Sequence, residues 1–193
     1  MTDCDAITER ITIGGRTATE SEKRNGGFKE KRLTLLAPGG GTVEAPVFRF
    51  RILAWHRSNE TSRRLDAIPG IGPALATALV ASVADANAFR SGRNFSAWIG
   101  LVPKQHSSGG KDKLGSISKQ GDRYLRSLFT AGALAVIRYA KIHGTQHRPW
   151  LTALLARRPT KVAAIALANK LARMAWAMMA KEERYKEPVA LAA

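Results

Sequence analysis

The chain has 193 residues, 45% of them hydrophobic, which excludes wholesale disorder and allows one domain with a core and a short appendage. The 31 lysines and arginines exceed the 15 acidic residues by 16, so an anionic partner is expected to offset their mutual repulsion. One cysteine, Cys4, excludes an internal disulfide, and no apolar signal segment opens the chain.

The first part of the chain, residues 1–47, lacks a regular pattern. Paired glycines and the run from Pro38 to Gly41 interrupt every candidate element. Short strands are expected only near residues 11–13 and 32–36, so this segment is predicted to be mostly loop. A helix is then expected over residues 48–65.

A sharp turn is predicted where the sequence reads Ile-Pro-Gly-Ile-Gly-Pro over residues 68–73. It resembles a helix-hairpin-helix, in which Gly70 and Gly72 permit close approach of another chain. Pro73 suits the first turn of the next helix, expected over residues 74–84. The free N–H groups at that helix N-terminus would then face a DNA phosphate. The alternative is a plain corner between two helices, packed inside the domain.

The aromatic-rich segment from Phe89 to Leu101 is expected to pack as core. A polar, glycine-rich loop is expected from Pro103 to Gly121, and it contains Ser107 and Ser108. The same loop holds lysines that could contact phosphates, Lys104, Lys111 and Lys113. A serine hydroxyl is a weak nucleophile until a base or a metal activates it. On these residues alone, Ser-Ser-Gly-Gly indicates only a turn.

Further helices are expected over residues 122–142, 150–156 and about 160–184, so the predicted fold class is mainly α. Asp122 or Ser118 is expected to cap the first of them. Basic side chains near the N-terminal end of this helix could instead bind a phosphate there. They are those of Lys119, Arg123 and Arg126. The apolar window over residues 162–180 contains Asn169, Lys170 and Arg173. These would be costly at a bilayer centre, so we expect a buried helix and no membrane partner.

Positive charge is concentrated after residue 50. Residues 1–50 hold eight basic and seven acidic residues, whereas residues 51–193 hold 23 basic and eight acidic ones. From Arg123 to Lys181 there are eleven basic residues, Arg157, Arg158 and Lys161 among them, and no acidic one. Such a run can be a solvated face, but at this length it is typical of a surface that neutralises phosphates. Nucleic acid is therefore the predicted partner.

The four histidines, His56, His106, His143 and His147, do not form a metal-ligand pattern. His143 and His147 are four residues apart, but Gly144 lies between them and no third ligand is near. All four are therefore predicted to be surface or loop residues, and no metal site is expected in this chain.

Several segments in fixed order resemble the C-terminal domain of the transposases of IS110-type insertion sequences, the RNA-guided or bridge recombinases. The resemblance covers roughly residues 52–185 and lies in residues 65–71, 100–110, 115–126, 163–170 and 173–176. It implies a helical domain whose serine links covalently to DNA during strand cleavage and rejoining. The spacing Pro-x-x-x-x-Ser-Gly matches that serine with Ser108, and Ser107 is the fallback.

In intact relatives the resemblance further implies an N-terminal RuvC-like nuclease domain, whose acidic residues hold Mg²⁺. Residues 1–47 do not resemble that domain, and residues 48–66 resemble the remnant of a connecting helix. Residues 67–187 are interpreted as the helical transposase domain. We therefore expect an N-terminally truncated transposase with no cofactor of its own. It would bind DNA without catalysis in the bacterial cytoplasm, at the nucleoid.

The partners that this interpretation allows are DNA, a guide RNA and further copies of the chain. The alternative, from another class, is a stand-alone, non-enzymatic DNA-binding module built on the helix-hairpin-helix. The residues expected to contact DNA are Gly70, Gly72, Lys104, Lys111, Lys113, Lys119, Arg123, Arg126, Arg157, Arg158 and Lys161.

Overall fold

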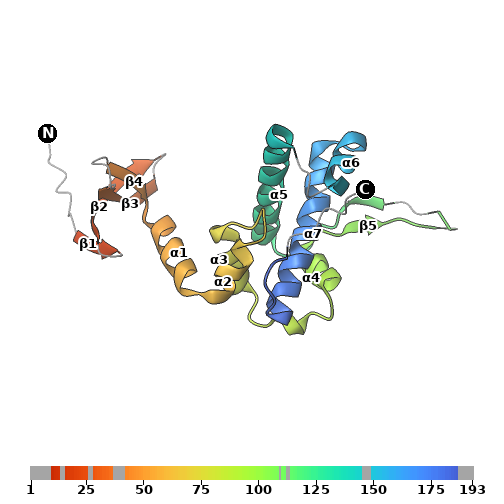
Figure 1. Cartoon of the computed structure of the whole chain (residues 1–193), viewed down its shortest axis with the longest axis horizontal. Coiled ribbons are helices and arrows are strands. Elements are labelled where there is room, and N and C mark those ends of the chain that lie inside the picture. Colours follow the sequence, from red (N-terminus) through yellow and green to blue (C-terminus); the bar gives the residue numbers. More distant parts are fainter. Residues whose placement is uncertain are drawn as a thin grey trace. The chain divides into compact units, whose positions relative to one another are not determined.

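The structure is a computed structural model that describes residues 10–13, 16–25, 28–36, 42–108, 110–111, 114–144 and 149–186 (Figure 1). The chain divides into two compact units, residues 1–55 and residues 56–193. The fold is mainly α, as the sequence predicts, and the helices that begin after residue 58 lie in the second unit.

The first unit contains an antiparallel sheet of four strands in the order β1-β2-β3-β4. The strands are β1 (Arg10–Ile13), β2 (Arg16–Asn25), β3 (Phe28–Leu36) and β4 (Thr42–Pro46). The two expected strands lie in β1 and β3, whereas β2 and β4 were not expected. Arg32 of β3 pairs with Ser21 on one side and Pro46 on the other. Strand β2 reads RTATESEKRN, so it carries no apolar alternation that would reveal it.

The helices are α1 (Val47–Ser58), α2 (Glu60–Asp66), α3 (Pro73–Ser82), α4 (Gly92–Ile99), α5 (Arg123–His143), α6 (Pro149–Arg157) and α7 (Thr160–Lys181), with a 3₁₀ turn η1 at Ala86–Ala88. The single helix expected over residues 48–65 is therefore two helices. Asn59 separates them with an extended backbone, and its side-chain oxygen accepts a hydrogen bond of 2.8 Å from the Ser62 N–H. Asparagine is one of the preferred residues at the position before a helix, so Asn59 begins α2 and does not continue α1.

The turn between α2 and α3 is packed against α5 and α7. Gly70 has a φ of +102°, and a Cβ there would lie 2.9 Å from Val136 and 3.0 Å from Leu171. On α5, a Cβ at Gly132 would meet the carbonyl oxygen of Gly70. Gly70 thus occupies a packed corner between helices, as in the alternative interpretation, whereas Gly72 is exposed where α3 begins.

Helix α7 contributes most to the core of the second unit, and it packs against α2, α4, α5 and α6. Among the helices of the described part of the chain, α7 is the one that is long and apolar enough to cross a membrane, judged by length and composition alone. Its buried side chains are those of Ala163, Ala164, Leu167, Ala168, Leu171, Ala172, Ala175 and Met178. They join one continuous apolar cluster, so we interpret α7 as the buried helix that the sequence predicts.

Most of the aromatic-rich segment packs as predicted, although Trp98 remains 38% exposed. Phe95, Ile99 and Leu101 are fully buried. The rings of Phe89, Phe95 and Trp98 contact one another, with centroids 5.1 to 5.8 Å apart. Such offset and edge contacts stabilise an aromatic cluster beyond the apolar area that it buries. These rings therefore hold α4 in the core and do not form an open platform.

Candidate nucleic-acid interface

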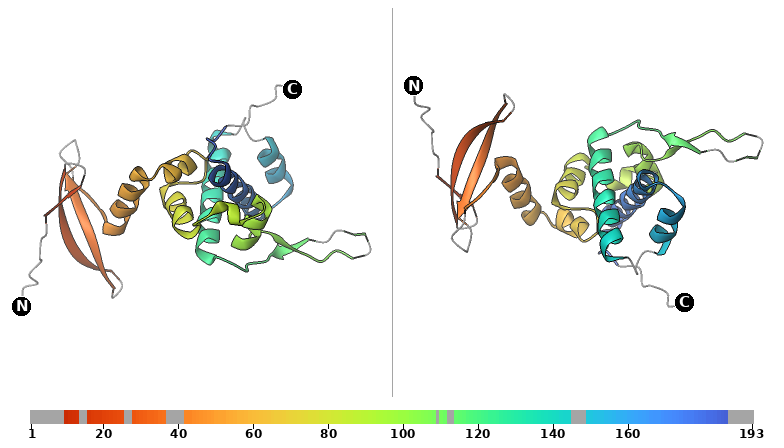
Figure 2. Two further views of the ribbon diagram at one scale, coloured as in Figure 1. Left: turned by 90° about the horizontal axis from the view of Figure 1, so that it is seen from below. Right: turned by 90° about the horizontal axis from the view of Figure 1, so that it is seen from above.

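An antiparallel hairpin, here called the arm (residues 103–117), projects from the helical unit (Figure 2). Its strands are β5 (Pro103–Gln105) and β6 (Leu114–Ile117). Pro103 pairs with Ile117 and Gln105 with Leu114, with an irregularity between the two pairs. The prediction of a loop over residues 103–121 is therefore wrong for residues 103–105 and 114–117, which form strands. Paired backbone groups hold such strands together without a row of apolar side chains.

Both candidate nucleophiles lie near the tip of the arm. Ser108 forms a bridge to Lys111, whose N–H donates to the Ser108 carbonyl oxygen over 3.2 Å. The Ser108 side chain is exposed. Ser107 is also exposed, and its hydroxyl accepts a hydrogen bond of 3.1 Å from the Gln105 amide. The arm thus carries both hydroxyls away from the core, on a turn that solvent and a large partner can reach.

The predicted phosphate-binding lysines fall partly on the arm. Lys104 lies before the turn of the arm and Lys111 at its other side, and both are exposed. Lys113 lies outside the described residues. His106 lies across from β6: a Cβ at Gly115 would be 3.0 Å from its ring. The arrangement therefore brings two cations and an imidazole to the same short hairpin as the serines.

Two glycines fix the base of the arm to the core. Gly121 has a φ of +107°, and a Cβ there would meet the carbonyl oxygen of Trp98. Gly100, with a φ of +83°, faces the Gln120 carbonyl oxygen in the same way. Only glycine allows both this backbone conformation and this closeness. The end of α4 and the start of α5 consequently hold the arm in place.

Arg126, predicted to contact DNA, also contributes to this base. Its Nη1 donates a hydrogen bond of 2.8 Å to the Ile99 carbonyl oxygen, and the side chain is half-buried. The guanidinium therefore satisfies the exposed carbonyl end of α4. Arg126 therefore has a structural role. The sequence pattern did not reveal it, because Ile99 lies 27 residues away in the chain.

At the start of α5, Asp122 is the cap. Its carboxylate accepts a hydrogen bond of 2.9 Å from the Leu125 N–H. This settles the choice between Asp122 and Ser118, whose own N–H donates to the Val102 carbonyl oxygen. Lys119 and Arg123 are exposed at this N-terminal end of α5.

The basic run from Arg123 to Lys181 lies largely on the surface. Arg157, Arg158 and Lys161 are exposed where α6 ends and α7 begins. Arg148 lies outside the described residues and Arg126 is half-buried. The other exposed members of the run are Arg123, Arg138, Lys141, Lys170, Arg173 and Lys181. With no acidic residue in the run, these side chains give the helical unit a positive surface.

One histidine differs from its predicted position. His56 is only 7% exposed, its Nδ1 lies 2.7 Å from the Ser62 hydroxyl, and its Nε2 lies 3.6 Å from an Asp66 carboxylate oxygen. The prediction of a surface histidine is wrong here. Spacings of six and ten residues carry no recognisable signal, so the contact could not be read from the sequence. His106 and His143 are exposed, and His147 lies outside the described residues.

The described residues do not fit a bound metal ion. Nowhere in the described part of the chain do three or more histidine, cysteine, aspartate or glutamate side chains gather as ligands. Hard cations such as Mg²⁺ take carboxylate, carbonyl and water oxygens. The described part of the chain therefore offers no side-chain cluster suited to holding Mg²⁺.

Comparison with known proteins connects this architecture to DNA transposition enzymes. The model of the family described as "Transposase IS116/IS110/IS902 family" matches residues 62–148. A protein of Pseudomonas aeruginosa named "Probable family 20 transposase" is 49% identical over 147 residues, which is 75% of this chain and 44% of that protein. The transposase for insertion sequence element IS1111A of Coxiella burnetii is 44% identical over 67% of this chain and 36% of its own length.

A third relative, the transposase for insertion sequence element IS1328 of Yersinia enterocolitica, is 42% identical over 61% of this chain and 35% of its own length. The chain therefore spans less than half the length of these curated relatives. The shared segment includes the α2–α3 corner, the arm and α5.

These matches define the helical unit as a transposase region. It is a region of the IS116/IS110/IS902 family, as the ordered segments of the sequence indicate.

Proposed function

We propose that the helical unit binds DNA as part of an insertion-sequence transposase and that the arm brings Ser108 to a phosphodiester. The observation that carries the proposal is the basic run of α5 to α7, whose described members are exposed except Arg126 and which contains no acidic residue. Cations on such a surface neutralise phosphates and release counterions, which favours binding without regard to sequence.

In the proposed reaction the Oγ of Ser108 attacks a backbone phosphorus. An oxygen–phosphorus bond forms to the serine, the bond from phosphorus to one sugar oxygen breaks, and the hydroxyl proton ends on that oxygen. Ser107 is the second candidate, because it is exposed beside Ser108 on the same turn. Lys104 and Lys111 support the proposal because cations near the phosphate offset its charge as the serine approaches.

The proposal extends to partners beyond this chain. Intact relatives would use Mg²⁺ held by carboxylates of their additional length, a guide RNA and further copies of the protein. DNA binding would also place the protein at the nucleoid. The alternative of a non-enzymatic helix-hairpin-helix module draws support from the exposed Gly72 at the start of α3. In an intact relative, a covalent protein–DNA adduct that disappears when the serine matching Ser108 is replaced by alanine would favour the transposase.

The proposed binding is tested by measuring the affinity for a fluorescent DNA duplex between about 50 and 200 mM salt. The logarithm of the affinity should fall linearly with the logarithm of salt concentration. Replacing Arg157, Arg158 and Lys161 together by glutamine should reduce the slope by about 2 to 3, close to one for each lost phosphate contact. Affinity that does not change with salt would exclude a phosphate-binding surface.

A further inference from the structure

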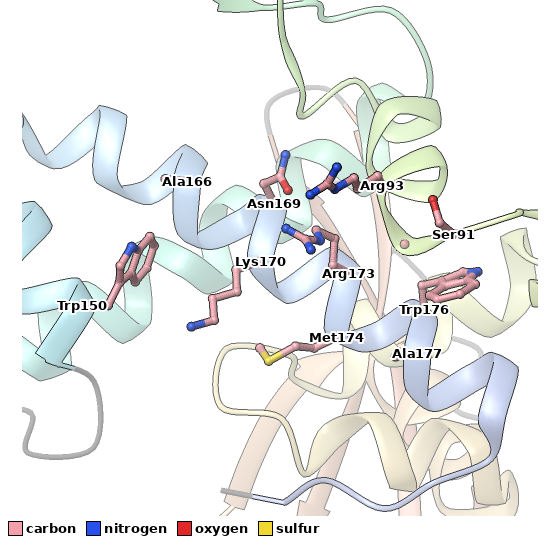
Figure 3. A pocket seen from close by; sticks show the side chains of 11 residues that line it. Ser91, Arg93, Trp150, Ala166, Asn169, Lys170, Arg173, Met174, Trp176 and Ala177 are labelled. Carbon is pink, nitrogen blue, oxygen red and sulfur yellow. The ribbon is translucent and has the colours of Figure 1, made fainter. Parts of the chain in front are cut away.

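A pocket of about 670 Å³ lies in the helical unit, between α4, α6 and α7 (Figure 3). Arg93 of α4 and Trp150 of α6 form two of its walls, and α7 contributes Asn169, Lys170 and Arg173. None of these residues belongs to the arm. The pocket is large enough for a small ligand or a nucleotide, whereas a DNA duplex is too wide to enter it.

The charge of this pocket is entirely positive. Arg93, Lys170 and Arg173 line it, and no carboxylate does. Within the described parts of the chain, neither arginine has an ion-pair partner, and both are exposed. Figure 3 shows the guanidinium groups of Arg93 and Arg173 on neighbouring sides of the pocket. Planar guanidinium groups match phosphate oxygens, so the arrangement favours an anionic ligand.

An aromatic ring stands beside these cations. Trp150 is 40% exposed, and the Lys170 ammonium lies 5.0 Å from the centroid of its ring. The half-buried Met174 adds apolar surface nearby. An indole face next to cations is the combination that binds unpaired nucleotides, because a base stacks on the ring while the cations contact its phosphate.

The walls of the pocket are held together by close packing. A Cβ at Gly92 would lie 3.2 Å from the Arg173 Cα, so α4 begins directly against α7. The Trp176 indole N–H donates to the Ala86 carbonyl oxygen over 2.9 Å, and the Asn169 amide donates to the Leu101 carbonyl oxygen over 3.3 Å. Side chains on such a fixed frame bind with a smaller loss of entropy.

We infer that this pocket binds an unpaired segment of nucleic acid, with a base stacked on Trp150 and adjacent phosphates held by Arg93, Lys170 and Arg173. The inference rests on the proposed function, since the pocket shares Lys170 and Arg173 with the basic run and adds Arg93 and Trp150 to it. It adds a selectivity for single strands that the exposed basic run does not explain. When the base stacks on Trp150, the Lys170 ammonium moves from the face of that ring to an adjacent phosphate of the bound strand.

The test measures the binding of fluorescent ten-nucleotide oligo(dT) and oligo(U), and of a random-sequence duplex, to the full chain and its variants. Trp150→Ala should weaken single-strand binding about tenfold, the loss typical of one stacked base. Trp150→Phe should retain most of the affinity, because it keeps a ring. Arg173 also belongs to the basic run, so Arg173→Gln should weaken duplex binding by about two- to fourfold and single-strand binding by a clearly larger factor.

Two matched controls separate the pocket from general charge and aromatic content. Arg63→Gln removes the same charge from an exposed site on α2 that lies outside both the basic run and the pocket, and Tyr139→Ala removes a ring that is 65% exposed. Neither should affect single-strand binding as the pocket variants do. Circular dichroism confirms that each variant is folded. Binding of oligo(dT) and oligo(U) alike supports the pocket, and a preference for one sugar identifies the natural ligand class.

Three outcomes would overturn the inference. The first is single-strand binding by the pocket variants that matches binding by their controls. The second is a loss of duplex binding in Arg173→Gln as large as its loss of single-strand binding. The third is binding of thymidine monophosphate as tight as that of oligo(dT). In each case duplex binding by the unmodified chain would leave the proposed function standing. If the chain bound neither duplex nor single strand, both the proposed function and this inference would fail.

Discussion

At the scale of single residues, Gly70 allows the turn after α2 to pack closely against α5 and α7. Its positive φ and the nearness of Val136 and Leu171 leave no room for a side chain. Gly70→Ala is expected to lower the free energy of unfolding by about 2–4 kcal/mol, from backbone strain and overpacking together. Denaturant unfolding measures this loss.

The matched control for this substitution is Gly72→Ala. Gly72 is exposed, and a Cβ there would meet nothing within 4 Å. The cost should stay below about 1 kcal/mol, the usual range for a change at the start of a helix. Equal losses for the two variants would show that the corner does not depend on the close approach at Gly70.

The contact between His56 and Ser62 gives a second prediction for single residues. Ser62 is completely buried, and its hydroxyl is 2.7 Å from His56 Nδ1. Ser62→Ala leaves that nitrogen buried without its partner, so we expect a loss of about 1–3 kcal/mol in the free energy of unfolding. Ser127→Ala is the control, because its hydroxyl is exposed; its effect should be within about 0.5 kcal/mol. Unchanged stability of Ser62→Ala would contradict the inferred contact.

At the scale of elements, the arm is predicted to be dispensable for folding. Its residues 104–108, 110–111 and 114–116 are exposed. Replacing residues 104–116 by Asn-Gly keeps a tight hairpin turn between Pro103 and Ile117. The melting temperature should change by less than about 3 °C, less than a loss of 1 kcal/mol would cause in a small domain. DNA affinity should fall, because Lys104 and Lys111 are lost.

The arm variant also separates folding from chemistry. A large fall in melting temperature would show that the arm stabilises the core, contrary to its exposure. A control that keeps the arm and changes only Lys104 and Lys111 to glutamine should lose affinity to a similar extent. If it bound DNA like the unmodified chain, the arm would contribute through something other than its positive charge.

The elements also show what the sequence could and could not predict. The long helices α5 and α7 were predicted within a few residues, because their apolar positions recur at helical spacing. Strands β2, β4, β5 and β6 were missed. Strand β2 is almost entirely polar, and β5 and β6 have only three and four residues, so none of these three shows the apolar alternation that reveals a strand. The break at Asn59 was missed because a capping side chain and a helix-interior one look alike in a sequence.

At the scale of the whole molecule, this chain alone is predicted not to cleave DNA. Ser108 is exposed on a turn, and a hydroxyl needs a base or a Lewis acid to become an effective nucleophile. The described residues bring no cluster of acidic side chains or histidines to it. Purified protein with Mg²⁺ and supercoiled DNA carrying the ends of the element should bind the DNA and leave it unnicked, as followed on agarose gels.

Ser108→Ala is the control for this prediction, and it should behave like the unmodified chain in both binding and nicking. Nicking, or a protein–DNA adduct that needs Ser108, would mean that the prediction fails. The candidate site as a whole was only partly visible in the sequence. The serines, the lysines and the basic run follow from residue order, whereas the pocket of Arg93 and Trp150 joins residues that no local pattern connects.

The central position of α7 restricts how related chains can change in length. Each residue added to a helix turns everything beyond it by about 100°. An insertion before Leu167 would rotate Leu171 out of the core and carry Lys170 and Arg173 away from the pocket. The described residues at the tip of the arm, 108, 110 and 111, are exposed, so the arm can gain or lose residues in pairs while its strands stay in register. Length differences among relatives should therefore accumulate between residues 105 and 114, and be absent between residues 163 and 178.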